Sequence, residues 1–248
     1  MTRLAIVSTP RSGNTWFRYI LARLYQLDQF AVHTPNALDW PALPENCVVQ
    51  IHWHNTVEFR CQLREHGFRV AVIARHPLDV LISILHFAPH EPQTACWLNG
   101  EGGNEESIYH KLPVDPAFVS YAISARVRAL LSVSSEWWGV QDALRVRYED
   151  LVRAPLETLN AVGSELGLTA VSLSDAIDTL TLERLKPTAP NQHFWQGQPG
   201  LWRSLLPLEE ARQIEAAHAD VFSRLGYLCE PDPGLTREQS ASLWSALA

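Results

Sequence analysis

Four apolar runs of strand length stand out along the chain, at 3–8, 47–52, 69–74 and 144–148. Amphipathic patterns, with apolar residues three and four positions apart, predict helices at 16–27, 77–85, 117–138, 155–166, 172–185 and 208–225. Short apolar strands that alternate with helices are typical of an α/β domain with a parallel sheet. We therefore predict a single α/β domain in which helices flank a central parallel β-sheet.

Three polar stretches interrupt this pattern. Residues 31–46 are rich in proline and read as a loop. Residues 88–116 form a long excursion, of a length that is often a functional lid or a disordered segment. Residues 186–207 are rich in Pro, Gly, Asn, Gln and aromatics, and a short helix is expected at 237–247. We expect one domain over residues 1–228 and a C-terminal tail over 229–248.

Charge and composition narrow the classes of protein that fit. The chain has 20 Lys and Arg against 27 Asp and Glu, a net charge of −7, which argues against a nucleic-acid partner. No apolar run approaches the roughly 20 residues of a membrane helix, and the N-terminal stretch is too short for a signal peptide. The four cysteines are widely spaced and form no CxxC pair. We expect a reduced, soluble, cytoplasmic protein with no membrane span.

The loop after the first predicted strand is the most informative segment. Gly13 lets the backbone approach a ligand closely, at the start of a helix whose amides favour an anion. Arg11, Ser12 and Thr15 add donors that suit phosphate oxygens. The ATP- and GTP-binding pattern GxxxxGK[ST] does not match, because Asn14 stands where its lysine belongs and the leading glycine is missing. Taken alone, the loop fits an anion site and an ordinary turn with a surface arginine equally well.

Residues 10–16, with the sequence PRSGNTW, resemble the phosphosulfate-binding loop of the sulfotransferases that use PAPS (3′-phosphoadenosine 5′-phosphosulfate). The final tryptophan makes this pattern far more specific than a lone glycine loop. Arg11 stands where cytosolic members usually have Lys, and because a guanidinium keeps its proton, its role must be charge stabilisation. The resemblance implies that the following residues bind the co-substrate: Arg11, Ser12, Gly13, Asn14, Thr15 and Trp16.

Residues 72–83 resemble the second signature of the same family. There a strand-end arginine, here Arg75, and a serine eight residues on, here Ser83, hold the 3′-phosphate. Parallel sheets bind ligands beyond the carboxyl ends of their strands, which favours this interpretation. The alternative is that Arg75 simply pairs with Asp79 or Asp150.

Two further segments follow in the family's order. Residues 147–151, RYEDL, resemble a segment whose tyrosine, here Tyr148, lies near the nucleotide; packing against the next helix is an equally good interpretation. Residues 197–203 resemble the late GxxGxW loop that closes on the 3′-phosphate side, beginning at Gly197. Cytosolic members usually have Arg and Lys before that glycine, and both cations are absent here. The candidate replacements are His193 and Arg203.

A histidine ends the second predicted strand. The imidazole of His52 can take the proton that an acceptor hydroxyl or amine must lose. The resembled family has a catalytic histidine here within Thr-His-Leu-Pro, whereas this chain reads IHWH and has Gln50 where many members have Lys. His54 is the competing base, and we favour His52.

The resemblance implies a P-loop NTPase-like nucleotide-binding fold and transfer of the sulfuryl group from PAPS to a hydroxyl or amine of a small-molecule acceptor. The leaving group would be adenosine 3′,5′-bisphosphate. His52 would act as the base and Arg11 would stabilise the departing phosphate, and the reaction would need no metal. The alternatives are a decayed nucleotide-binding member and a small-molecule kinase, which would need the absent lysine. The sequence names no acceptor. The oligomeric state stays open, because the KxxxTVxxxE dimer motif of animal cytosolic members is not visible after Trp202.

Overall fold

Five parallel β-strands form one sheet in the computed structural model, which describes residues 1–168, 173–188 and 193–247. The strands are β1 (Thr2–Val7), β2 (Asp28–Val32), β3 (Asn46–Ile51), β4 (Phe68–Ala74) and β5 (Leu144–Arg147). Their order is β2-β3-β1-β4-β5, and each neighbouring pair is parallel. The predicted α/β class with a central parallel sheet is confirmed. Strand β2 was not predicted, and the loop predicted from residue 31 begins inside it. The strand lies at the sheet edge with mostly exposed side chains, and its apolar run is only three residues long, Phe30, Ala31 and Val32.

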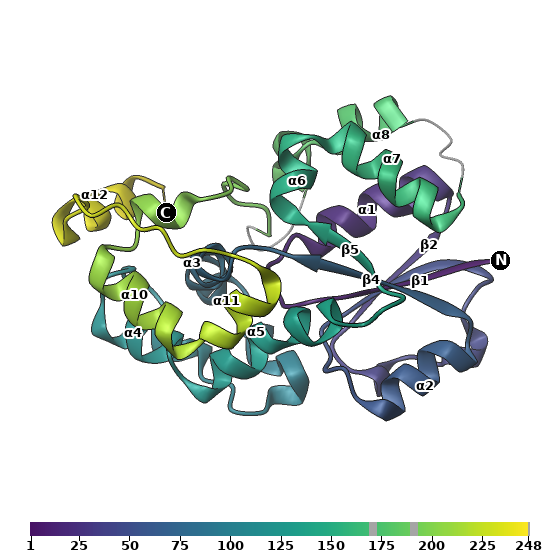
Figure 1. The fold of residues 1–248 in the computed structure, drawn as a ribbon, viewed down its shortest axis with the longest axis horizontal. Helices are drawn as coiled ribbons and strands as arrows, with labels where there is room; N and C mark the ends of the chain where they lie inside the picture. The colour runs from purple at the N-terminus through teal and green to yellow at the C-terminus, as the bar shows by residue number, and fades with distance from the viewer. Residues whose placement is uncertain (169–172, 189–192, 248) are drawn as a thin grey trace. The chain divides into compact units, whose positions relative to one another are not determined.

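Helices fill most of the remaining described chain (Figure 1). The α-helices are α1 (Asn14–Tyr25), α2 (Val57–Glu65), α3 (Pro77–Phe87), α4 (Pro116–Ala122), α5 (Ala125–Trp138), α6 (Tyr148–Arg153), α7 (Pro155–Leu166), α8 (Leu173–Thr179), α9 (Leu182–Leu185), α10 (Leu208–Ala217), α11 (Ala219–Leu225) and α12 (Arg237–Leu247). Short 3₁₀ helices include η3 (Ala88–His90), η4 (Pro92–Gly100), η5 (Glu105–Ile108) and η8 (Leu201–Ser204).

Three of the predicted helices are interrupted, and α2 was not predicted. The pattern at 117–138 forms α4 and α5, because the Ser124 hydroxyl accepts from the backbone N–H of Val127 and starts a new helix. The pattern at 208–225 forms α10 and α11, which meet at His218. The helix predicted at 172–185 begins outside the described residues and continues as α8 and α9, and part of the stretch at 186–207 also lies outside them.

The chain divides into two compact units. Unit 1 comprises Met1–Arg75 with Val133–Ala189 and holds the whole sheet. Unit 2 comprises His76–Ser132 with Pro190–Ala248, and its described elements are helices. Helix α5 begins in unit 2 and ends in unit 1.

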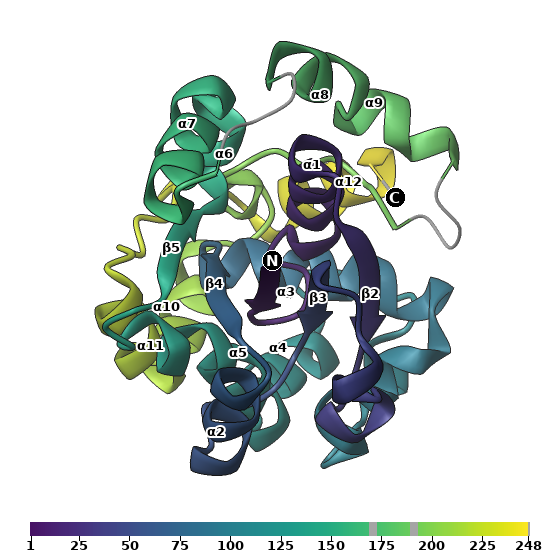
Figure 2. The same ribbon diagram turned by 90° about the vertical axis from the view of Figure 1, so that its right-hand side faces the viewer.

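In unit 1, helices α1, α7 and α8 cover one face of the sheet and α2 covers the other (Figures 1 and 2). Side chains of the sheet, α1 and α7 form an almost fully buried apolar core that includes Ile6, Phe17, Leu21, Ile73, Val146 and Leu159. Burying one such side chain stabilises the fold by about 1.5–3 kcal/mol. This core therefore fixes α1, and the loop before it, against the sheet.

The register of the strands brings their carboxyl ends to one edge. Val7 pairs with Ile51 on one side of the sheet, and Ala74 pairs with Arg147 on the other. The chain leaves the strands at this edge through Ser8, His52, Arg75 and Tyr148. Ligands of open parallel sheets bind outside this edge.

In unit 2, a buried arginine holds the excursion that follows α3. Arg126 on α5 forms an ion pair with Glu105, with Nε and Oε1 2.8 Å apart. Its Nη1 donates to the carbonyl oxygens of Trp97 and Glu101, each at 2.9 Å, and its Nη2 donates to that of Thr94 at 3.2 Å. The Arg126 side chain thus fixes the part of the excursion that includes η4 and η5, so this part is not a loose lid.

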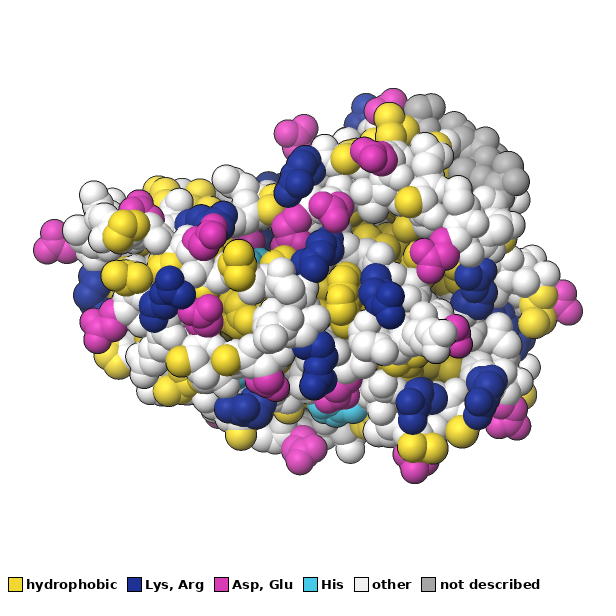
Figure 3. Space-filling model, in the orientation of Figure 1, with side chains coloured by type: hydrophobic (Ala, Val, Ile, Leu, Met, Phe, Trp, Pro, Cys, Tyr) yellow, Lys and Arg dark blue, Asp and Glu magenta, His cyan; other side chains and the backbone are white. Residues whose placement is uncertain are grey.

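The surface in Figure 3 carries mixed charge. Lys and Arg side chains lie among Asp and Glu over the face drawn there, which differs from the single-sign stripe typical of nucleic-acid-binding proteins. Within the described ranges, none of the helices combines the length and hydropathy that a membrane span requires.

Candidate nucleotide-binding and catalytic site

The turn between β1 and α1 has an unusual backbone. Arg11 has a φ of 65° and Gly13 a φ of 95°, both in the left-handed region, which is strained for a residue with a side chain. A Cβ atom at position 13 would lie 2.5 Å from Cδ2 of Tyr148, so only glycine fits there. Strain of this kind is found at active sites and ligand clamps.

Hydrogen bonds hold this turn in place. The Asn14 side chain donates to the carbonyl oxygen of Thr9 at 3.0 Å and accepts from the Ser8 hydroxyl at 2.5 Å. The Ser134 hydroxyl accepts from the backbone N–H of Thr9 at 2.8 Å and donates to the carbonyl oxygen of Ile73 at 3.1 Å. Asn14 therefore braces the loop through its side chain. Ser134 ties the loop to β4, and no motif in the sequence marked it.

Two arginines meet at the turn. Nη1 of Arg75 donates to the carbonyl oxygen of Arg11 at 3.2 Å. The guanidinium of Arg75 also lies over the Tyr148 ring, 4.6 Å from its centroid. Burial, and next the positive charge of Arg75, lower the pKa of Arg11 to about 9, so Arg11 is still protonated at neutral pH. The turn therefore concentrates positive charge where the sheet ends.

Two buried donors at this turn have no hydrogen-bond partner among the described residues. They are the Ser12 hydroxyl and the Nε–H of Arg75. A buried polar group without a partner costs about 1–3 kcal/mol, and few native proteins keep one without a reason. Bound oxyanions would supply the missing acceptors, and the one at Ser12 would lie beside a helix N-terminus that favours negative charge.

The aromatic residues of the predicted site pack against the loop. Trp16 meets Tyr148 edge-on, with ring centroids 6.1 Å apart, and its Nε1 donates to the carbonyl oxygen of Leu180 at 2.6 Å. Tyr148 is buried and contacts both the loop and Arg75. The carboxylate of Asp150, one alternative partner for Arg75, instead lies 3.9 Å from Arg153.

His52 is buried beside the same turn. Its Nδ1–H donates to the carbonyl oxygen of Ser8 at 2.8 Å, which places the lone pair of the neutral ring on Nε2. Burial is the main cause that lowers the pKa of His52 to about 4, and the nearby His33 and Arg11 lower it further. At neutral pH the ring is therefore in the form that accepts a proton.

His54 lies farther along and has a different partner. Its Nδ1 is 3.1 Å from Oε1 of Glu136, and Oε2 of Glu136 accepts from the backbone N–H of Asn55 at 3.0 Å. A carboxylate that orients a histidine is also the arrangement of many catalytic bases. The geometry thus keeps His54 as a competitor, with Glu136 as a partner that the sequence did not reveal.

In unit 2, the predicted late loop is fastened to α3. The buried carboxylate of Asp79 accepts from the backbone N–H groups of Gly200 at 2.6 Å and Trp202 at 3.0 Å. The His76 ring stacks on Trp202, with centroids 4.8 Å apart. Asp79, which the sequence analysis named as an alternative partner of Arg75, therefore shapes the late loop.

The other predicted residues of unit 2 have separate settings. Ser83 is buried on α3, and Gly197 has a φ of 67°. Arg203, a candidate replacement for the absent cations, instead lies 3.2 Å from the carboxylate of Glu230.

Solved structures of sulfotransferases resemble this chain in fold. Mouse sulfotransferase SULT7A1, crystallised with PAP, superimposes with a TM-score of 0.67 at 15% identity, over 90% of this chain and 85% of that one. The chain has the sulfotransferase fold. Retinol dehydratase, in complex with androsterone and inactive cofactor PAP, gives a TM-score of 0.59 at 16% identity, over 89% and 80% of the two chains. No protein-family model and no curated protein matches the sequence.

The sulfotransferase fold explains why the predicted loop and strand ends meet at one edge of unit 1. The residues that sequence reasoning missed are Ser134, Glu136 and His33, together with the loop-holding role of Asp79. Each acts on a partner far away in the sequence, so no local spacing could reveal it. Among the described residues, no group of three or more His, Cys, Asp or Glu gathers as a metal site would require.

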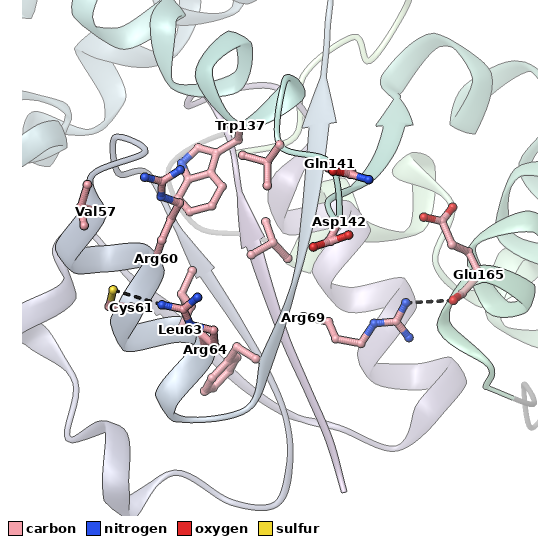
Figure 4. A pocket seen from close by; sticks show the side chains of 13 residues that line it. Val57, Arg60, Cys61, Leu63, Arg64, Arg69, Trp137, Gln141, Asp142 and Glu165 are labelled. Carbon is pink, nitrogen blue, oxygen red and sulfur yellow. Dashed lines mark hydrogen bonds between the residues drawn. The ribbon is translucent and has the colours of Figure 1, made fainter.

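A pocket of about 710 Å³ lies elsewhere in unit 1 (Figure 4). Figure 4 shows Arg60 and Arg64 projecting from α2 on one side, and Arg69 bonded to the Glu165 backbone on the other. The pocket adjoins the first residues of β4, whereas Arg75 follows its last residue. It therefore lies at the opposite end of that strand from the predicted loop, and none of the predicted site residues lines it.

Replacement of Asp79 by alanine should release the late loop of the sulfotransferase fold. We expect amide hydrogen exchange at Gly200 and Trp202 to quicken roughly 10- to 100-fold, because each amide loses a hydrogen bond to a charged group, worth about 1.5–3 kcal/mol. The control is Asp115→Ala, which removes the cap of α4 in the same unit. Unchanged protection of both amides in Asp79→Ala would contradict this role.

Proposed function

We propose that the protein is a PAPS-dependent sulfotransferase acting on a hydroxyl or amine of a small-molecule acceptor. The observation that carries the proposal is the turn after β1. There the charged guanidiniums of Arg11 and Arg75 and the buried, unpartnered donor of Ser12 lie beside neutral His52. The two cations and the hydroxyl donor suit a bound oxyanion, and the neutral imidazole suits an acceptor that must lose a proton. The PAP in structures of the same fold supports the choice of nucleotide.

The proposed reaction is an in-line displacement at sulfur. The acceptor oxygen or nitrogen forms a bond to sulfur, and the bond from sulfur to the bridging oxygen of the phosphosulfate breaks. The electron pair leaves on the phosphate of adenosine 3′,5′-bisphosphate, and Nε2 of His52 takes the acceptor's proton. Arg11 and the amides at the start of α1 stabilise the charge that grows on the phosphate. Catalysis is then positioning plus electrostatics.

The assignment of the nucleotide contacts follows the sequence resemblance and the loop geometry. The 5′-phosphosulfate is assigned to the loop, with the Ser12 hydroxyl and the backbone N–H of Thr15 as donors and Trp16 as packing. The 3′-phosphate is assigned to Arg75, with Ser83 and Gly197 as contacts that the resemblance alone supports. A cytoplasmic location is part of the proposal and rests on the four widely spaced cysteines.

The test is ligand preference followed by turnover. Calorimetry should show tighter binding of adenosine 3′,5′-bisphosphate than of ADP, and labelled PAPS should donate its sulfuryl group to members of a panel of phenols, alcohols and amines. Preference for ADP would point to a kinase. Binding of the bisphosphate with no transfer to any acceptor would point to a decayed member.

Replacement of Arg75 by alanine should mainly weaken binding of the bisphosphate. Its buried Nε–H has no partner among the described residues, so a phosphate gains a charge-assisted bond there. Loss of that bond should raise the Kd roughly 10- to 100-fold, for about 1.5–3 kcal/mol. Calorimetry with adenosine 3′,5′-bisphosphate and adenosine 5′-phosphate measures the effect. If the variant keeps the wild-type preference for the bisphosphate, the 3′-phosphate site lies elsewhere.

A further inference from the structure

Arg18 on α1 is a half-buried cation that the proposed reaction has not used. Its Nε donates to Oε1 of Gln50 at 3.1 Å, and its guanidinium lies 5.0 Å from the ring centroid of Tyr19. Among the described residues, no carboxylate forms an ion pair with Arg18, and burial lowers its pKa. A positive charge in this setting is costly unless an anion meets it.

Structural arginines of this chain are bonded differently. In Arg69, Nη1 and Nη2 donate to the carbonyl oxygens of Leu166 and Glu165, at 2.8 and 2.9 Å. Arg126 likewise bonds three carbonyl oxygens through Nη1 and Nη2. Arg18 instead bonds two side chains, Gln50 through Nε and Tyr19, and it bonds no backbone carbonyl oxygen in the part of the chain that the structure describes. Because a guanidinium carries five N–H donors, donors remain for a ligand.

Gln50 connects Arg18 to the reaction centre. The same Oε1 atom that accepts from Arg18 also accepts from the Thr15 hydroxyl of the phosphosulfate loop, at 3.4 Å. Gln50 is buried and stands two residues before His52. At a rise of about 3.3 Å per residue, the Cα atoms of positions 50 and 52 are about 7 Å apart. Arg18 is therefore held near both the loop and the candidate base.

We propose that Arg18 contacts the oxygens of the sulfuryl group while it is transferred. This inference rests on the proposed function and adds a cation on the acceptor side of sulfur, whereas Arg11 serves the departing phosphate. Gln50 fixes the orientation of the guanidinium, so its charge requires little reorganisation as the sulfur–oxygen bond breaks. The proton still goes to His52, and the electron pair still leaves on the phosphate.

Arg18→Gln is the test, because product and co-substrate differ by the group in question. Adenosine 3′,5′-bisphosphate lacks the sulfuryl group, so its Kd should stay within about 2-fold of wild type. With a neutral phenol as acceptor, kcat should fall roughly 100- to 1,000-fold, as for loss of one preorganised donor. Arg23→Gln, an exposed arginine on the same helix, is the matched control and should keep the wild-type kcat.

A second variant tests whether the effect is one of charge. In Arg18→Gln combined with Gln50→Lys, a cation returns from β3, and kcat should recover at least 3-fold relative to Arg18→Gln. Wild-type kcat in Arg18→Gln would overturn the inference, and so would a loss confined to acceptors that carry a carboxylate. An equal loss of bisphosphate affinity and kcat would overturn it as well. A wild-type protein that binds the bisphosphate but transfers nothing would overturn the proposed function and this inference together.

Discussion

Replacement of His52 by alanine should lower the rate of sulfuryl transfer roughly 100- to 10,000-fold while PAPS still binds, the range expected for loss of a general base. The hydrogen bond from Nδ1–H to the Ser8 carbonyl fixes the tautomer, and the lone pair lies on Nε2. His52 follows the last residue of β3, at the edge of the sheet where the loop lies, and the charge of Arg11 is close enough to lower the pKa of the ring. Single-turnover assays with one good acceptor, together with calorimetry on the bisphosphate, measure both effects.

His54→Ala and Glu136→Gln are the matched variants for this prediction. Both act on the neighbouring histidine and its carboxylate partner, 3.1 Å apart, without touching His52. A loss confined to these two would move the base to His54 and leave the rest of the mechanism intact. Full activity in both histidine variants would exclude a histidine base at this edge.

The pKa of His52 also predicts a pH dependence. Its value of about 4 in the folded protein lies below the ordinary 6.5, because burial disfavours the charged ring. The base form is thus present throughout pH 5–8, and kcat/KM should show no acid limb near 6.5 that is due to this residue. Since the unfolded chain binds the proton more readily, stability should fall as pH drops from about 6.5 towards 4. His52→Gln should flatten that fall.

Arg11→Ala should cost on the order of 3 kcal/mol in the transition state, roughly a 100-fold loss of kcat, because one preorganised donor is removed. Arg11 adjoins the helix N-terminus at the proposed leaving-group end, and a pKa of about 9 keeps it charged at neutral pH. Ground-state affinity for the bisphosphate should change less than kcat, because the phosphate gains charge only as the bond to sulfur breaks.

Arg11→Lys is the control, since it keeps the charge and loses the planar fork. Its kcat should lie between those of wild type and Arg11→Ala. Because Arg11 has a φ of 65°, thermal unfolding of each variant should be measured first, to show that the turn is retained. An unchanged kcat in Arg11→Ala would remove Arg11 from the reaction.

The sequence by itself determined the fold class and the location of the turn between β1 and α1. Strands β1, β3 and β4 lie inside the sheet, so burial forces long apolar runs that are visible in the sequence. Strand β5 lies at the other edge, and its alternation of buried Leu144 and Val146 with exposed Arg145 is a strand signal of its own. The loop at 8–16 is equally local, because the left-handed turn at Gly13, the start of α1 and the donors of Arg11 and Ser12 lie within a few residues.

Only the tertiary structure decided how the site is held and which groups share it. The exposed edge strand β2 and the break between α4 and α5 depend on sheet position and on one cap, which apolar periodicity does not record. The links from Ser134 to Thr9, from Glu136 to His54 and from Asp79 to the late loop join residues that are about 80 to 125 positions apart. Such bonds depend on parallel register and helix packing. A single sequence specifies these through its whole core and not through any local spacing.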